Sequence, residues 1–101
     1  MALTSKQRSQ LRGLASSMDT ILQVGKGGIT ENVIASADEA LRSRELIKGK
    51  VLENSMLTAR EACDALSAAC NAEQVQVIGT KFVLFRRNPK EPKIQLVKSK
   101  K

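Results

Sequence analysis

The stretch Gln23-Val24-Gly25-Lys26-Gly27-Gly28-Ile29-Thr30 lies between a short apolar run and an amphipathic segment. Gly25 and Gly28 make a GxxG frame around Lys26 and a third glycine. Glycine permits positive φ and close backbone approach, and Thr30 is a residue type that caps helices. A lysine-tipped loop beside a helix N-terminus suits a phosphate group. A strand-to-helix turn that merely needs glycine would show the same residues, so the pattern alone leaves both interpretations open.

The apolar pattern on either side of this loop alternates between helical and strand spacing. Three segments have helical spacing after a capping residue, with capping boxes at Thr4/Gln7 and Thr58/Glu61; they are residues 5–17, 31–44 and 59–71. Four β-rich runs are predicted as strands: residues 20–24, 46–52, 74–78 and 81–86. Gly49 weakens the second of these strands or marks a bulge or a close approach. Ile94-Gln95-Leu96 is a candidate for a short extra edge strand.

This order, α-β-α-β-α-β-β, predicts an α/β (α+β) fold with helices packed over one four-stranded mixed sheet. A chain of 101 residues has the size of one compact domain. We assign residues 1–97 to that domain and residues 98–101 to a basic tail.

The charge distribution favours a nucleic-acid partner. The net charge of the chain is +7, with +3 in residues 1–30, −3 in residues 31–80 and +7 in residues 81–101. A basic beginning and a basic end around an acidic middle favour nucleic acid over an anionic membrane. The terminal lysines would also fit a tail that serves only solubility.

The composition argues against several other classes. The chain has no histidine, no G-x-S-x-G elbow and no nucleotide P-loop, so catalysis, a small-molecule substrate, a cofactor and a metal site are not expected. Only two residues are aromatic, which disfavours base stacking. No apolar run is long enough to span a membrane. Cys63 and Cys70 are expected to be reduced core residues of a cytoplasmic monomer.

The residues expected to contact nucleic acid are glycine-loop residues and flanking cations. The GXXG loop of KH domains clamps a nucleotide backbone in this way. Phosphate contacts give affinity with little sequence information, so recognition of RNA shape and backbone is expected. The predicted contact residues are Gly25, Lys26, Gly27, Gly28, Lys6, Arg8, Arg12, Arg86 and Arg87.

Several sequence blocks, in matching order over residues 3–97, together resemble the CRM (chloroplast RNA splicing and ribosome maturation) domain in its bacterial stand-alone, YhbY-type form. The blocks are Leu3-Thr4-Ser5-Lys6-Gln7-Arg8, Leu11-Arg12-Gly13-Leu14-Ala15, the loop at residues 23–30, Glu45-Leu46-Ile47-Lys48, Val75-Gln76-Val77-Ile78-Gly79 and Phe82-Val83-Leu84-Phe85-Arg86.

The resemblance implies a fold similar to the C-terminal domain of translation initiation factor three. It further implies RNA contact through Gly25 to Gly28 and a partner in precursors of the large ribosomal subunit. Two residues depart from the family pattern. Gly49 stands where a β-branched residue is usual, and Phe85 stands where tyrosine is common.

Our first hypothesis is therefore a non-enzymatic RNA-binding protein that contacts structured ribosomal RNA during large-subunit assembly. Binding to another structured RNA, intron-like or non-coding, is an alternative. Another is a protein-interaction module that docks through its acidic second helix, with a solubilising basic tail. A third is non-specific DNA binding.

Overall fold

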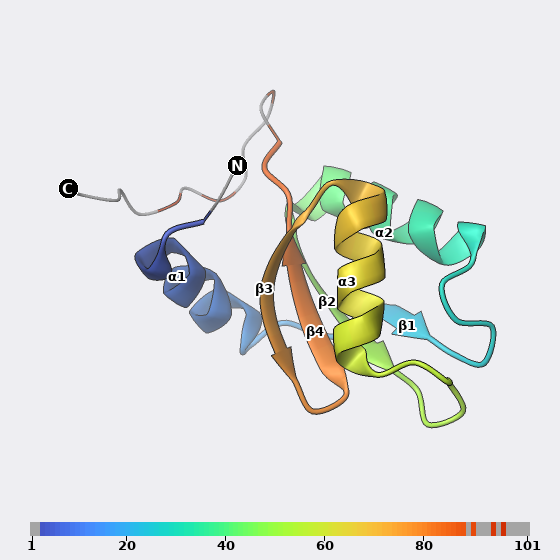
Figure 1. Cartoon of the computed structure of the whole chain (residues 1–101). Helices are drawn as coiled ribbons and strands as arrows, with labels where there is room; N and C mark the ends of the chain where they lie inside the picture. Colours follow the sequence, from blue (N-terminus) through green and yellow to red (C-terminus); the bar gives the residue numbers. More distant parts are fainter. Residues whose placement is uncertain (1–2, 89, 91–93, 95, 97–101) are drawn as a thin grey trace.

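The computed structural model describes residues 3–88, 90, 94 and 96 (Figure 1). The predicted order of elements is confirmed, with a shorter first helix and first strand than expected. The proposed tail at residues 98–101 lies outside the described residues. The elements are α1 (Ser5–Ala15), β1 (Leu22–Val24), α2 (Glu31–Arg44), β2 (Leu46–Val51), α3 (Ala59–Cys70), β3 (Glu73–Ile78) and β4 (Lys81–Phe85).

Each helix begins at a threonine whose hydroxyl accepts a backbone N–H of the first turn. The three Oγ1 atoms, of Thr4, Thr30 and Thr58, lie 3.1, 3.2 and 3.1 Å from the nitrogens that they satisfy. Both predicted capping boxes are present. Because the first N–H groups of a helix have no partner within the helix, these side chains determine where each helix starts.

The four strands form one mixed sheet in the order β1-β2-β4-β3. β1 runs parallel to β2, whereas β2 and β3 are both antiparallel to β4. The predicted hairpin between β3 and β4 is confirmed, with Gly79 at a φ of +60°. Ile94 and Leu96 belong to no strand, and Gln95 between them lies outside the described residues.

Helices cover both faces of this sheet (Figure 1). α2 and α3 pack on one face over a core that includes Leu41, Leu66 and Phe82. α1 packs on the other face over a smaller core that includes Leu11 and Phe85. β4 serves both cores, because its successive side chains point to opposite faces and its last four are all buried.

Gly49 in β2 closely approaches a side chain of the neighbouring strand, which is one of the predicted alternatives for this glycine. It lies opposite Phe82 of β4. A Cβ built on Gly49 would be 2.3 Å from Cζ and 2.6 Å from Cε1 of Phe82. The ring therefore fills the space that a side chain at position 49 would use. β2 pairs with β4 without a register shift, so the bulge alternative is wrong.

The departure at position 85 has a simple physical explanation. The Phe85 ring is completely buried in the core beneath α1. A ring without a hydroxyl needs no hydrogen-bond partner in such a place.

Glu45 connects the segment after β4 to the sheet. It is fully buried and adopts a positive φ of 67° at the end of α2. Its carboxylate accepts the backbone N–H of Asn88 at 2.6 Å and that of Ile94 at 2.7 Å. Its own carbonyl accepts the N–H of Arg86 at 2.8 Å. One acidic side chain thus holds the chain where it leaves β4.

Cys63 and Cys70 are free and buried, as predicted. Burial, and then the neighbouring Asp64 carboxylate, raise the pKa of the Cys63 thiol to about 11. Burial likewise raises the pKa of Cys70. Because the thiolate is the reactive form of cysteine, neither thiol is activated, and the Cys70 thiol donates to the carbonyl of Ile34 at 3.8 Å.

Candidate nucleic-acid interface

The glycine loop forms a tight turn between β1 and α2. The N–H of Gly28 donates to the carbonyl of Gly25 at 3.0 Å. Gly28 has a φ of +71°, which explains why glycine is needed there. Lys26 and Gly27 form the exposed tip of the turn. A Cβ on Gly27 would be 3.4 Å from the methyl group of Thr30, so a side chain fits at this position.

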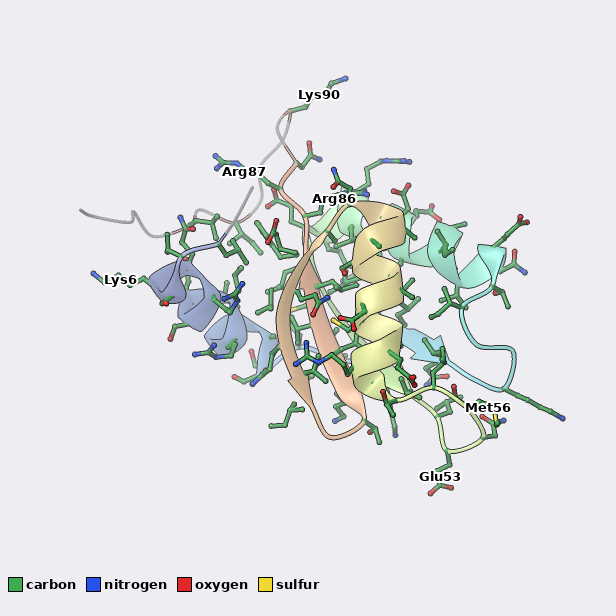
Figure 2. The ribbon with its side chains drawn as sticks, in the orientation of Figure 1. Lys6, Glu53, Met56, Arg86, Arg87 and Lys90 are labelled. Carbon is green, nitrogen blue, oxygen red and sulfur yellow. The ribbon has the colours of Figure 1, made fainter. Side chains whose placement is uncertain are left out.

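A second loop, between β2 and α3, packs against the glycine loop. The N–H of Leu52 donates to the carbonyl of Val24 at 2.8 Å. A Cβ built on Gly25 would touch the side chains of Leu52 and Asn54 at 3.6 and 3.7 Å. Figure 2 shows Glu53 and Met56 projecting from this second loop, and Met56 is 91% exposed. The two loops together form one end of the molecule.

Two lysines face each other on the sheet beside these loops. Lys50 of β2 and Lys81 of β4 are direct cross-strand partners. Like charges in this position repel each other. In the described part of the chain neither lysine forms an ion pair. A hollow of about 610 Å³ adjoins Lys50; its lining residues are Lys50, Val51, Leu52, Glu53, Asn54 and Thr80.

Lys50 and Lys81 are not among the residues that the sequence pattern predicted to contact nucleic acid. The alternation Lys48-Gly49-Lys50 places the two lysines of that triplet on one face of a strand. The strand register that brings Lys81 opposite Lys50 is visible only in the structure. Lys48 has a structural contact instead, because its ammonium donates to the carbonyl of Ala15 at 3.1 Å.

The predicted cations of α1 lie apart from the glycine loop. Lys6 and Arg12 are exposed and Arg8 is half-buried. α1 lies on one side of the sheet, and the loop between β1 and α2 lies at the opposite side of the molecule (Figure 1). Arg87 is exposed beyond β4, also away from the loop (Figure 2). The predicted residues therefore form two separate basic regions.

Arg86 is engaged inside the protein. Its guanidinium forms an ion pair with Asp38 of α2 at 2.7 Å. It also donates to the carbonyls of Cys70 and Asp38 at 2.9 and 3.0 Å. The hydrogen bond from Arg86 holds the pKa of the Asp38 carboxyl below its usual value. These contacts join the end of β4 to α2 and to the end of α3. We therefore assign Arg86 a structural role, and the proposed site does not include it.

Two further properties concern the described residues as a whole. They contain no group of three or more cysteine, aspartate or glutamate side chains placed to hold a metal ion. Among the helices in the same residues, none has the length and apolar character needed to cross a membrane.

A small basic α+β domain with a glycine loop before a helix is an architecture that binds nucleic-acid backbones. The model of the CRS1 / YhbY (CRM) domain matches residues 3–86 of the chain. The chain therefore belongs to the CRM domain family, as its sequence blocks indicated.

Named relatives of similar length agree with this assignment. The "Probable RNA-binding protein YqeI" of Bacillus subtilis is 39% identical over 94 residues, which are 93% of this chain and 98% of that protein. An "RNA-binding protein" of Haemophilus influenzae is also 39% identical over 94 residues, covering 93% of this chain and 94% of the relative.

A solved structure shares the fold. It is the solution structure of a hypothetical protein from Staphylococcus aureus, described as a candidate RNA-binding protein. Its sequence is 45% identical, and the TM-score is 0.79 with 95% of this chain and 100% of that chain covered.

Proposed function

We propose that this protein binds structured ribosomal RNA in the cytoplasm, as a monomer, during assembly of the large ribosomal subunit. The observation that carries the RNA contact is the Lys50–Lys81 pair beside the glycine loop. Two like charges held face to face repel each other, and this repulsion costs stability. A phosphate placed between them removes that repulsion, which gives the arrangement a binding role.

The glycine loop extends the same basic region. Lys26 at its exposed tip adds a third cation, and the loop leads directly into the N-terminus of α2. The N–H groups of a helix N-terminus and its positive dipole end both favour a phosphate. Successive phosphates of one RNA strand can thus contact the loop and the lysine pair.

Recognition through RNA shape follows from where the aromatic residues lie. The chain has two phenylalanines and no tryptophan, tyrosine or histidine. Phe82 and Phe85 are both completely buried. No aromatic ring is therefore exposed for stacking on a base, which is the usual element of sequence-specific RNA reading. Contacts to phosphates and to the 2′-hydroxyl groups of a folded RNA remain.

The cations of α1 and Arg87 form the second basic region of the proposal. Lys6, Arg8 and Arg12 are on α1, which lies away from the glycine loop (Figure 1), although α1 packs on the same sheet face as the Lys50–Lys81 pair. A large folded RNA can reach both regions, whereas a short oligonucleotide contacts one. This geometry favours a large folded RNA, as ribosomal RNA is, over a short single strand.

Replacing Lys26 and Gly27 by aspartate should weaken binding to a large-subunit RNA fragment about tenfold, because charges that contact phosphates are reversed or added. Fluorescence anisotropy at several salt concentrations measures this affinity. The variant should also show a smaller dependence of log affinity on log salt. A docking interface built from apolar contacts would not weaken with salt in this way.

The matched control places the same change in formal charge elsewhere. Ser43→Asp with Arg44→Asp alters the exposed last turn of α2, at the end of that helix away from the glycine loop. This control should retain most of the affinity. Equal losses in both variants would mean that only net charge matters, and the role of the loop would be refuted. Equal binding of duplex DNA would support the non-specific alternative.

The ribosomal partner is tested by sedimentation of a cell lysate in a sucrose gradient, with each fraction probed for the protein. We expect co-migration with precursors of the large subunit and not with mature ribosomes. Protein that stays at the top of the gradient even at low salt would refute the assembly role. Binding to RNA in the first experiment would then still hold, with another structured RNA as the partner.

A further inference from the structure

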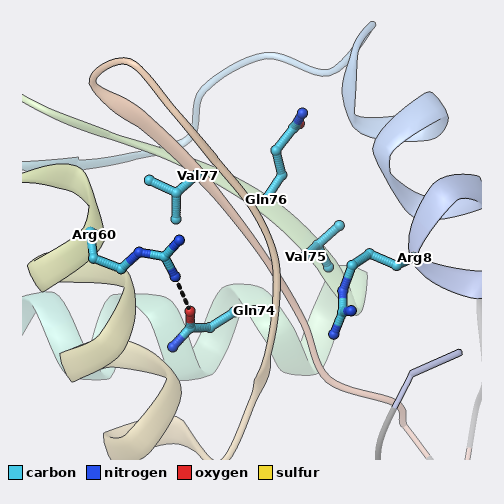
Figure 3. Close-up of a pocket in the computed structure, with 6 residues that line it drawn as sticks. All are labelled: Arg8, Arg60, Gln74, Val75, Gln76 and Val77. Carbon is cyan, nitrogen blue, oxygen red and sulfur yellow. Dashed lines mark hydrogen bonds between the residues drawn. The ribbon is translucent and has the colours of Figure 1, made fainter. Parts of the chain in front are cut away.

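β3 lies at an edge of the sheet, and its outer side has no partner strand in the described part of the chain. Ile78 and Lys81 flank the two-residue turn and pair with each other. Residues flanking such a turn exchange both backbone hydrogen bonds, so the preceding residue, Val77, directs its N–H and C=O outward. A hollow of about 320 Å³ follows this edge (Figure 3); it is lined by Arg8, Arg60, Gln74, Val75, Gln76 and Val77.

Two arginines flank this hollow from opposite faces of the sheet. Arg60 comes from α3 and Arg8 from α1, and Figure 3 shows them on either side of β3. Gln74 holds the Arg60 guanidinium through a hydrogen bond of 3.0 Å. The amide of Gln74 is itself fixed by Asp64, at 2.7 Å. Neither arginine forms an ion pair within the described residues.

A β-bulge in β3 changes which residues point to each face of the sheet at this point. The pairing with β4 skips Val75 between Gln74 and Gln76. As a result Val75 packs on the α1 face and Val77 on the α3 face, although they are two residues apart. Gln74 lies before the bulge, on the face of Arg60. Gln76 lies after the bulge, on the face of Val83 and α1. The edge thus presents one arginine on each face, and both arginines line the same hollow.

We propose that an extended acidic segment of a partner protein adds to the outer edge of β3 as a fifth strand. Its backbone would pair with the outward groups of β3, as in other cases of strand addition. Successive side chains of a strand point to opposite faces. Two adjacent acidic residues would therefore place one carboxylate on Arg60 and the next on Arg8.

The geometry favours this occupant over two others. RNA has no backbone ladder that matches a strand edge, and no aromatic residue lines the hollow. If a second copy of the chain occupied this edge, β3 of one copy would pair with β3 of the other about a two-fold axis. Each face would then bring an arginine towards its counterpart, and like charges across strands are unfavourable.

The test uses a fluorescent peptide, Thr-Val-Glu-Asp-Val-Thr. Its fluorescence anisotropy measures the affinity, and amide NMR spectra of the isotope-labelled full chain show which residues of the protein the peptide contacts. We expect saturable shifts at Val75, Gln76 and Val77. The isomer Thr-Glu-Val-Asp-Val-Thr, whose carboxylates share one face, should bind more weakly. Combined Arg8→Glu and Arg60→Glu substitutions should weaken the first peptide about tenfold, since two exposed ion pairs are lost.

Reversing the charges of the peptide and of the protein together shows whether lost binding comes from lost charge pairing or from misfolding of the substituted protein. The peptide Thr-Val-Lys-Lys-Val-Thr should bind the doubly substituted protein better than it binds the unmodified chain. Absence of shifts at β3 with any peptide would overturn the proposal. The arginines would then serve only to keep the exposed edge strand from pairing with other chains. RNA is expected to affect α1 around Arg8, which belongs to the second basic region. Saturable shifts of the Val75, Gln76 and Val77 amides by RNA in place of the acidic peptide, or self-association of the chain through β3, would overturn the proposal as well. None of these results depends on whether the glycine loop binds RNA.

Discussion

Gly49→Val should lower the free energy of unfolding by about 3 kcal/mol, because it overfills a packed core. The first atom of any side chain at position 49 would lie 2.3 Å from the Phe82 ring. Phe82 is fully buried between the sheet and α3, so the ring has no free space to enter. Urea unfolding monitored by circular dichroism measures the change.

A double substitution shows whether the ring is the cause. Phe82→Leu alone should cost about 1–2 kcal/mol through lost burial. Combined with Gly49→Val, it should give a protein more stable than the sum of the two losses allows, because the smaller side chain leaves room. Gly13→Val is the matched control, since a Cβ on Gly13 meets nothing within 4 Å. Strict additivity of the pair would contradict the packing explanation.

Glu45→Ala should cost about 3 kcal/mol, because two partly buried backbone N–H groups lose a charged acceptor. They are the N–H groups of Asn88 and Ile94. The positive φ of residue 45 persists in alanine, so the substitution brings no relief of strain. Thermal unfolding gives the stability, and hydrogen exchange at Ile94 reports release of the segment.

Glu39→Ala provides the comparison on the exposed side of α2. A surface substitution of this kind should change stability by less than about 0.5 kcal/mol. If Glu45→Ala behaved like Glu39→Ala, the buried carboxylate would have no anchoring role. Glu45→Gln should lie between them, since one amide oxygen can still accept one N–H.

Local sequence signals predicted the elements well, because capping and turn chemistry act over a few residues. Thr4, Thr30 and Thr58 begin the helices as expected, and Asn71 ends α3 in the left-handed conformation. Helical spacing also puts Leu11, Leu14 and Ala15 on one face of the first helix, yet only Leu11 and Ala15 are buried. Leu14 is 43% exposed, since α1 covers only part of its sheet face. Periodicity cannot specify how far a helix is covered.

The site was predictable only where it is local. The glycine loop and its cap occupy consecutive residues, and their arrangement follows from the pattern. The Lys50–Lys81 pair depends on strand register, and the ion pair of Arg86 with Asp38 depends on where α2 lies relative to the residue that follows β4. Contacts between distant segments leave no signature in a single sequence. The separation of the two basic regions also depends on which face α1 covers.

The central position of β4 has a consequence for synthesis on the ribosome. β4 is the last strand in the described part of the chain, yet it lies between β2 and β3 and contributes to the cores on both faces. A nascent chain that ends before residue 81 has both helical layers but lacks the strand between them. Because domains fold as units, neither layer can close on such a chain. Folding during translation must therefore wait until nearly the whole domain has been synthesised, and until then the apolar faces of α2 and α3 stay open to chaperones.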